Sequence, residues 1–324
     1  MKVISNIHSL PTKQRNGFEI DLCKYPKSKM SFESLVRFFF MSFKYDYILL
    51  DSTSFDLFGF AFLKLVLPFN PCKLIALDLI LAKPKGLKER LKQVLKIILL
   101  KQIHLLLVYF KNTNGYQKIF RINARKFRYV PFKINCYELV LKTKISDEGY
   151  IFTGGKTRRD FQTLLKAVRD LPYPVKIVTP ANDELIKHGS YLDESLLPTN
   201  IEVIHDDGSA ESFIKFIAAS KLVVLPIRKE NISASGIGVY IMSMALKKCV
   251  IISKGPGVED VITPEMAILV PPEDPIALKL AIERAYNDDS FRKKFEESGY
   301  SYAINLRGEE RLLESIVNEL KMIL

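Results

Sequence analysis

The sequence predicts an α/β protein made of two Rossmann-like lobes that face each other across a cleft. Short apolar runs typical of buried strands alternate with amphipathic helical segments. This alternation is interrupted by a less patterned stretch at residues 133–149 and starts again at Tyr150. It is typical of parallel sheets covered by helices. A chain of 324 residues has room for two such units. We therefore predict domains at residues 1–145 and 146–324.

In the first domain, the strands are predicted from runs of consecutive apolar residues such as YDYILLD and KLIALDL. The segments between them have apolar residues at helical spacing. Strands are expected at residues 2–7, 18–22, 45–51, 73–79, 103–109 and 127–132. Helices are expected at residues 31–43, 55–67, 86–101 and 116–122.

The second domain opens with the strand YIFTGG, which ends in a glycine pair and leads into the helix KTRRDFQTLLKAVRDL. Further strands are expected at residues 175–179, 201–205, 221–226, 249–253 and 266–270. Further helices are expected at residues 183–188, 211–219, 239–246, 276–287, 290–303 and 308–323. In such sheets, ligands bind at the carboxyl ends of the strands.

Charge is divided unevenly between the two halves. Residues 1–150 hold 26 Lys and Arg against 11 Asp and Glu, whereas residues 151–324 hold 22 against 25. The net charge of +12 is thus the sum of +15 and −3. The basic half is expected to face an anionic partner, either a membrane surface or a nucleic acid. No RNA-binding motif accompanies the charge, so we expect no nucleic acid.

The compartment is expected to be the cytoplasm. The four cysteines form no CxxC pair and have no histidine at metal-ligand spacing, which predicts reduced thiols and no metal. The N-terminal residues lack the pattern of a signal peptide. Lysines interrupt every apolar run before it reaches the roughly 18 residues that a spanning helix needs.

The segment 83–101 is amphipathic. Its apolar residues recur at helical spacing: Leu87, Leu91, Val94, Leu95 and Ile98. Its lysines recur along another face: Lys85, Lys88, Lys92 and Lys96. The pattern resembles a helix that lies in a membrane interface. The alternative is a helix packed on its own sheet with the lysines in water, the usual arrangement of amphipathic helices. The basic charge and the neighbouring stretch FDLFGFAFLKLVLPF favour the membrane.

Two glycine-bearing turns are the candidate ligand sites. The first is the cluster Gly154, Gly155, Lys156, Arg158 and Arg159, where a strand ends and a helix begins. The second is SASGIGVYIMSMALKKCVIIS, where Gly236 precedes a helix. Glycines allow a ligand to approach the backbone, helix N–H groups bind anions, and guanidinium groups bind two oxygens at once. The pattern suits a diphosphate, although a Walker loop and a GxGxxG motif are both absent.

The second domain resembles the C-terminal half of retaining glycosyltransferases with the GT-B fold. The resemblance rests on four segments in order: GGKTRRDFQTLLKAV, IEVIHDD, VVLPIRKENISASGIGVYIMSMALKKCVIISKGPGVEDVI and ILVPPEDPIALKLAIERAYND. It implies that this lobe binds a nucleoside-diphosphate sugar as co-substrate, without another cofactor or a metal. The first domain is similar in pattern only and would bind the acceptor.

The resemblance also implies roles for individual residues. Lys156, Arg158 and Arg159 would neutralise the diphosphate, and Arg159 would act in catalysis as charge grows on the leaving group. The donor would also contact Gly154 and Gly155, the backbone of Ser235, Gly236 and Ile237, and His205 near the nucleobase. The alternative for His205 is an ordinary surface histidine.

The sequence departs from the family at two glutamates that contact the sugar and the ribose. Ser235 and Ser243 occupy the matching positions. The usual histidine of the N-terminal lobe is also missing, and Asp78 lies near its place. Asp78 is a candidate catalytic residue that contacts the sugar or the acceptor; its alternative is a buried capping aspartate.

The resulting hypothesis is a peripheral membrane glycosyltransferase. It would lie on the inner face of the cell membrane and transfer a sugar to a lipid-linked or polysaccharide acceptor. The alternative is a non-catalytic GT-B-like scaffold or partner subunit that has lost the donor-site glutamates.

Overall fold

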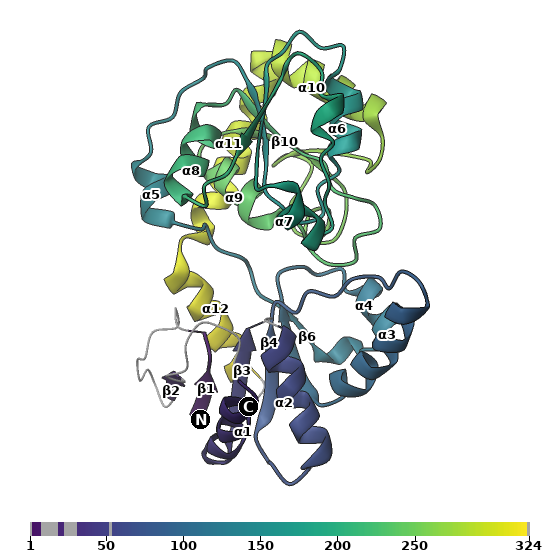
Figure 1. Ribbon diagram of the computed structural model, residues 1–324. Coiled ribbons are helices and arrows are strands. Elements are labelled where there is room, and N and C mark those ends of the chain that lie inside the picture. Colours follow the sequence, from purple (N-terminus) through teal and green to yellow (C-terminus); the bar gives the residue numbers. More distant parts are fainter. Residues whose placement is uncertain (1, 8–18, 23–30, 52–53, 323–324) are drawn as a thin grey trace. The chain divides into compact units, whose positions relative to one another are not determined.

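The computed structural model describes residues 2–7, 19–22, 31–51 and 54–322 (Figure 1). The chain divides into two compact units, each with its own six-stranded parallel sheet. Unit 1 contains residues 1–130 and 316–324, and unit 2 contains residues 131–315. The prediction of two Rossmann-like lobes is confirmed.

The strands of unit 1 are arranged in the order β2-β1-β3-β4-β5-β6. They are β1 (Lys2–Ser5), β2 (Glu19–Leu22), β3 (Tyr47–Asp51), β4 (Lys73–Leu77), β5 (Ile103–Val108) and β6 (Phe127–Tyr129). The intervening helices are α1 (Phe32–Met41), η1 (Ser42–Lys44), α2 (Ser54–Val66), α3 (Leu87–Leu100), α4 (Asn114–Phe120) and η2 (Ala124–Lys126). Helix α1 packs against α2, and α2 packs against α3.

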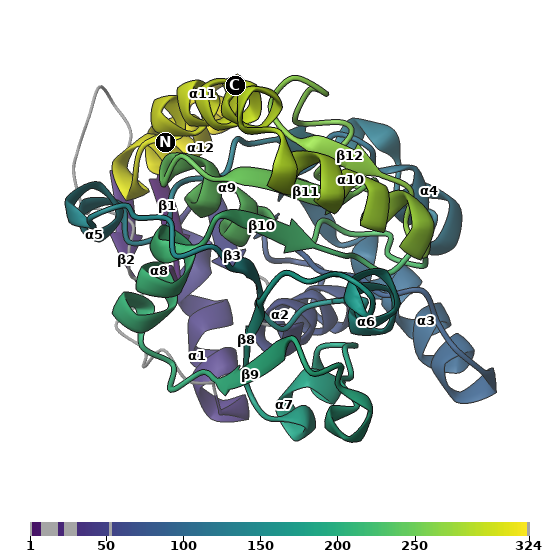
Figure 2. The same ribbon diagram turned by 90° about the horizontal axis from the view of Figure 1, so that it is seen from above.

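The strands of unit 2 are arranged in the order β12-β11-β10-β7-β8-β9. They are β7 (Ile151–Gly154), β8 (Val175–Thr179), β9 (Ile201–His205), β10 (Leu222–Leu225), β11 (Cys249–Ser253) and β12 (Ile268–Val270). The first helices of the unit are α5 (Tyr137–Lys142), α6 (Phe161–Val168), α7 (Asn182–Lys187), η3 (Glu194–Leu196) and α8 (Ala210–Ala219). The later helices are α9 (Ile237–Ala245), α10 (Pro275–Asn287) and α11 (Asp289–Leu306). Helix α12 (Glu309–Lys321) begins in unit 2, and its residues from Ile316 onward belong to unit 1. Figure 2 shows β10, β11 and β12 side by side, with α10 near them.

Two features of unit 2 position its candidate site. The switch point of the sheet lies where β7 and β10 are neighbours, because β8 and β9 continue to one side and β11 and β12 to the other. The turn at Gly155 directly follows the carboxyl end of β7, and the turn at Gly236 lies in the connection from the carboxyl end of β10 to α9. Ligands bind at such switch points in open α/β sheets.

The less patterned stretch at residues 133–149 groups with unit 2 in the structure. It contains the short helix α5, which the sequence analysis did not predict. The backbone N–H of Ser146 donates to the carbonyl of Ala218, and the Lys248 ammonium donates to the Ser146 carbonyl at 2.7 Å. These bonds attach the stretch to unit 2, and the unit boundary falls at residues 130 and 131 instead of near 145.

Candidate active site

The first glycine turn is shaped around a buried arginine. Gly155 follows β7 with a φ of +88°, a conformation that favours glycine. A Cβ atom at this position would lie 2.8 Å from Nη2 of Arg159. Gly155 therefore leaves the space that the guanidinium group occupies.

The Arg159 guanidinium is buried without an acidic partner. The residue is 2% exposed, and no carboxylate in the described residues forms an ion pair with it. Its Nε donates to the Gly154 carbonyl at 2.8 Å and its Nη1 to the Thr157 carbonyl at 3.0 Å. Burial lowers the pKa of Arg159 to about 10, so the group stays charged at neutral pH. An unpaired buried charge is costly, and an anionic ligand would offset that cost.

The second glycine turn meets the same guanidinium. Gly236 caps α9 with a φ of +80°, and a Cβ atom there would lie 3.4 Å from Nη1 of Arg159. The Arg159 side chain thus lies between the two glycine turns, next to the N-terminus of α9. This places a cation, two accessible stretches of backbone and the helix N–H groups in one place, as the diphosphate prediction requires.

Contacts from neighbouring loops fix Arg159 in this position. Its backbone N–H donates to Oγ of Ser190 at 2.7 Å, and that hydroxyl donates to the Lys156 carbonyl at 2.6 Å. Arg159 also forms an antiparallel bridge with Ile227. The adjacent Asp160 cannot pair with it, because its carboxylate caps α6 through the N–H and hydroxyl of Thr163.

The other two predicted cations have different surroundings. The Lys156 ammonium donates to Glu184 at 3.1 Å on the surface. Glu184 also bonds with Lys187 and His188, and the hydrogen bonds from Lys156, His188 and Lys187 lower its pKa to about 2. Arg158 has a φ of +57°, and its guanidinium packs over Gly189. These contacts direct both side chains away from the space between the two glycine turns.

The two serines at the glutamate positions bond to their own surroundings. Ser235 is buried, and its hydroxyl accepts from the Asn231 amide at 2.8 Å. Ser243 is fully buried, and its hydroxyl donates to the Val239 carbonyl one helical turn earlier. Ile237 is buried at the first turn of α9. The structure thus encloses Ser243 within unit 2, whereas a donor-binding role needs an accessible hydroxyl.

His205 lies at the carboxyl end of β9, as predicted. Its ring is exposed, with Nε2 3.7 Å from Oε2 of Glu194. Asp206 and Asp207, which follow His205 in the sequence, accept backbone hydrogen bonds from Gly208 and Ser209.

The sequence analysis missed Arg228. Its backbone N–H donates to the Arg158 carbonyl at 3.1 Å, and its Nε is buried without a hydrogen-bond partner. It also missed Asn231, whose side chain holds both Ser233 and Ser235. The only available signal was their position in the segment IRKENISAS, between the strand β10 and Gly236.

Asp78 lies in unit 1, directly after β4, with a φ of +51°. Its backbone N–H donates to the Leu107 carbonyl at 2.8 Å. Burial, and secondarily the charge of Asp51, raises the pKa of the Asp78 carboxyl to about 7. A carboxyl group with this pKa can gain or lose a proton near neutral pH.

Comparisons with known proteins give the class. The structure is similar to sucrose-phosphate synthase from Thermosynechococcus elongatus, with a TM-score of 0.69 and 15% identity over 99% of this chain and 98% of that one. It is also similar to HepE from Anabaena, solved in complex with UDP and glucose, with a TM-score of 0.65 and 14% identity over 94% and 86% of the two chains. A UDP-forming α,α-trehalose-phosphate synthase from Burkholderia vietnamiensis gives a TM-score of 0.58 and 13% identity over 85% and 72%. The fold is therefore GT-B.

A family model matches part of the sequence. Residues 156–302 match the family model described as glycosyl transferases group 1. Unit 2 thus carries a group 1 glycosyltransferase domain, and the protein is a transferase. No curated protein matches the sequence. No group of metal-binding side chains occurs in the part of the chain that the structure describes.

Proposed function

We propose that the protein transfers a sugar from a nucleoside-diphosphate donor to a lipid-linked or polysaccharide acceptor at an anionic membrane surface, with retention of configuration. The observation that carries the proposal is the buried, unpaired Arg159 between Gly155 and Gly236. A diphosphate would supply the missing negative charge, and the two glycines would allow its close approach. Retention is proposed from the family resemblance.

The proposed chemistry assigns one role to each unit. The acceptor oxygen forms a bond to the anomeric carbon of the sugar, and the bond from that carbon to the diphosphate breaks. Its electron pair remains on the diphosphate, where Arg159 and the N-terminus of α9 stabilise the growing charge. We place Asp78 at the acceptor, where a carboxylate with a pKa of about 7 can receive a hydroxyl proton.

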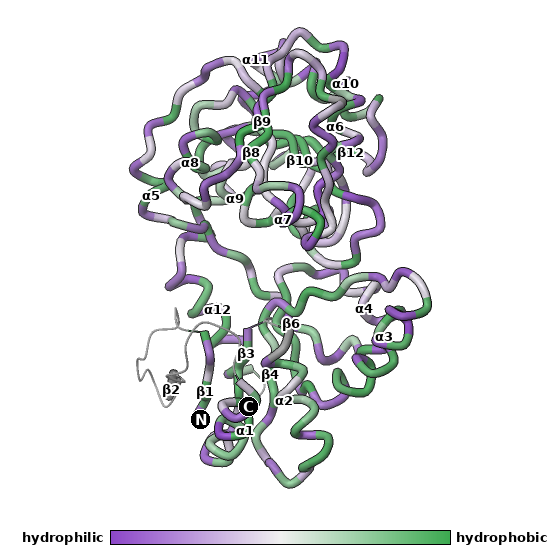
Figure 3. The backbone as a smooth tube through the Cα atoms, in the orientation of Figure 1, coloured by the Kyte–Doolittle hydropathy of each residue, from purple (hydrophilic) through white to green (hydrophobic). Residues whose placement is uncertain are grey.

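The membrane part of the proposal is supported by the orientation of α3. Its apolar stripe is exposed instead of packed on the sheet: Leu87, Leu91, Val94, Leu95 and Ile98. Leu87 and Leu91 are 81% and 75% exposed. Leu99 and Leu100, at the end of the helix, are its only buried residues. Figure 3 shows apolar and polar segments alternating along α3. This arrangement differs from that of a helix packed on its sheet by its apolar face.

Two other helices of unit 1 also carry exposed apolar side chains. Among the described residues, exposed large apolar side chains also occur on α1 and α2: Phe32, Phe40, Met41, Phe62, Leu65 and Val66. Large exposed apolar patches rimmed by charge mark membrane or protein contacts. The lysines of α3 favour an anionic membrane. No helix among the described residues is long and apolar enough to cross a bilayer.

The transferase part can be tested with purified protein and a panel of UDP- and GDP-sugars. UDP-glucose comes first, because HepE has been solved with it. We expect donor hydrolysis, or transfer when a polyprenyl-phosphate sugar acceptor is supplied in vesicles. If no donor binds or turns over, the proposal is wrong. The configuration of the product, determined by NMR, tests retention separately.

The enclosed Ser243 favours a second candidate, a non-catalytic GT-B-like subunit. In this candidate the donor binds weakly or without turnover, because a carboxylate that would hold the ribose is missing. Nucleotide binding without turnover, in the presence of a competent acceptor, would support it. Gain of donor use in Ser243→Glu would instead show that the site is weakened but active.

A further inference from the structure

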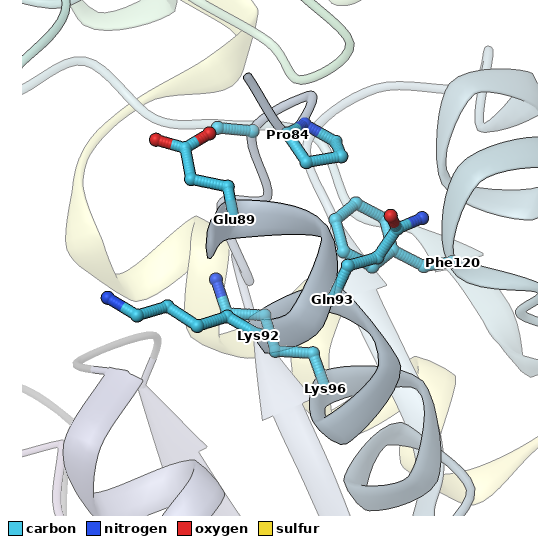
Figure 4. A pocket seen from close by; sticks show the side chains of 7 residues that line it. Pro84, Glu89, Lys92, Gln93, Lys96 and Phe120 are labelled. Atoms are coloured by element: carbon cyan, nitrogen blue, oxygen red, sulfur yellow. The ribbon is translucent and has the colours of Figure 1, made fainter. Parts of the chain in front are cut away.

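The polar side of α3 borders a pocket in unit 1. The pocket has a volume of about 250 Å³ and is lined by Pro84, Glu89, Lys92, Gln93, Lys96 and Phe120. Figure 4 shows the side chains of Lys92 and Lys96 reaching to the side of α3 on which Glu89 also lies. Two ammonium groups one helical turn apart therefore border the same small space.

Neither lysine has an acidic partner among the described residues. Lys92 forms no ion pair or hydrogen bond with the part of the chain that the structure describes. The Lys96 ammonium lies 5.9 Å from the centre of the Phe58 ring. The one carboxylate of the pocket, Glu89, accepts a hydrogen bond from the backbone N–H of Lys85. The lining of the pocket thus carries two positive charges and one negative charge, which leaves an excess of one positive charge for an anion.

The loop above the pocket is firmly held and begins at Asp78. The Tyr116 hydroxyl accepts from the Leu81 N–H at 2.8 Å and donates to the Leu79 carbonyl at 2.6 Å. This bond pair fixes the connection from β4 to α3. The same connection carries the candidate acceptor residue at its start and the pocket at its end.

The apolar stripe and the pocket lie at different depths when α3 is placed in a membrane interface. The stripe reaches the acyl chains, and the pocket reaches the headgroups. The stripe and the pocket lie on different sides of α3, and an α-helix with its side chains is about 10 Å across. An interfacial helix buries its apolar face about 5–10 Å into the boundary between headgroups and acyl chains. The lysines at the pocket would then lie at the level of the lipid phosphates.

We propose that this pocket binds the phosphate group of a membrane lipid through Lys92 and Lys96. The proposal rests on the membrane association proposed above and adds a specific site to it. Lysine ammonium groups bind phosphate oxygens as point charges. A terminal phosphate, with more charge and more free oxygens than a phosphodiester, would fill the space between them best.

The test compares two lysine pairs in the full-length protein. Lys92→Ala/Lys96→Ala removes the pocket cations, and Lys83→Ala/Lys88→Ala removes the same charge from exposed positions outside the pocket. Each protein is floated with vesicles of phosphatidylcholine that contain either phosphatidic acid or phosphatidylglycerol, at matched surface charge. Circular dichroism confirms that each variant is folded.

We expect the wild type to bind vesicles with phosphatidic acid about tenfold more tightly than vesicles with phosphatidylglycerol. A tenfold difference in affinity corresponds to about one charge-assisted hydrogen bond. The pocket variant should lose this preference, and the control variant should keep it while binding both vesicles less. If both variants prefer phosphatidic acid over phosphatidylglycerol to the same extent, the proposed phosphate site is wrong. Failure of the wild type to bind either vesicle would instead overturn the proposed membrane association.

Hydrogen exchange at residues 82–96 distinguishes the source of the phosphate. We expect protection with phosphatidic acid vesicles and none with glycerol 3-phosphate in solution. Equal protection by the soluble compound would show a site for free phosphate and would overturn the lipid assignment.

Discussion

Helices α3 and α6 are both amphipathic, and both follow a parallel strand. The apolar residues of α6 face the core of their own unit, whereas most of those of α3 face solvent. In α6, Phe161, Leu164 and Leu165 are buried in the core of unit 2. In α3, Leu87 and Leu91 are exposed, and only the last two residues are buried. An amphipathic pattern therefore specifies that a helix has two faces, but it does not specify which face the rest of the chain covers.

The charged groups at the sheet ends of the two units differ in a similar way. Unit 2 buries the cation Arg159 without an acidic partner among the described residues, whereas unit 1 holds the half-buried acid Asp78 near Asp51. Each charge lies at the carboxyl end of a parallel sheet and costs stability in the absence of a ligand. Under the proposed function, this contrast suits a donor unit that binds an anion and an acceptor unit that receives a proton.

The largest expected effect comes from removing the same atoms from the two helices. Leu164→Ala should lower the free energy of unfolding by about 2–5 kcal/mol, because it leaves a cavity in the core. Leu91→Ala should change it by less than about 0.5 kcal/mol, because the side chain is already exposed. Urea denaturation measures both. Similar losses in the two variants would mean that α3 is buried against its own unit.

The second effect concerns the cation of unit 2. Arg159→Ala should lower kcat/KM for donor by about 10²–10³-fold, as loss of one preorganised charge contact does. Lys156→Ala should cost less, because Glu184 already pairs with that ammonium. Arg169→Ala, at an exposed position of the same unit, is the matched control. Steady-state kinetics with the active donor gives the three values, and an equal effect for Lys156 and Arg159 would contradict the assignment.

Much of the fold could be predicted from apolar periodicity. The strands at Val175–Thr179 and Ile201–His205 were predicted with their observed bounds, because continuous apolar runs between turn residues have few alternatives. Helix α5 was missed because it lies in the less patterned stretch and follows Cys136 in a left-handed conformation, which residues other than glycine rarely adopt.

The candidate site could be predicted only in part. The glycine turns were visible because a strand, glycines, cations and a helix follow one another in the sequence. Which cation would lie between the turns was not predictable, since Lys156, Arg158 and Arg159 are adjacent and carry the same charge. The bridge from Arg159 to Ile227 and the ion pair from Lys156 to Glu184 decide it, and both depend on distant parts of the chain.

The third effect concerns the shielded acid of unit 1 and depends on pH. Because the pKa of Asp78 is raised in the folded state, its contribution to stability is fully present below the unfolded pKa near 3.9 and is lost as pH rises through about 7. Asp78→Asn should therefore gain stability relative to the wild type between pH 4.5 and pH 8, by on the order of 2 kcal/mol. Urea denaturation of both proteins across this range measures the difference. A difference that does not change with pH would show that the carboxyl has an ordinary pKa.

The smallest effect tests whether exposed apolar residues have the same function in both units. Leu91→Gln on α3 should weaken binding to vesicles of phosphatidylcholine and phosphatidylglycerol by about tenfold, because part of a leucine side chain no longer enters the acyl layer. Ile276→Gln on α10 is the matched control, since Ile276 is 72% exposed in unit 2. It should leave vesicle binding unchanged. Flotation over a lipid titration measures both variants. If both substitutions weaken vesicle binding equally, the vesicles contact exposed apolar residues of either unit. The exposed apolar residues of α3 would then have no membrane function that those of unit 2 lack.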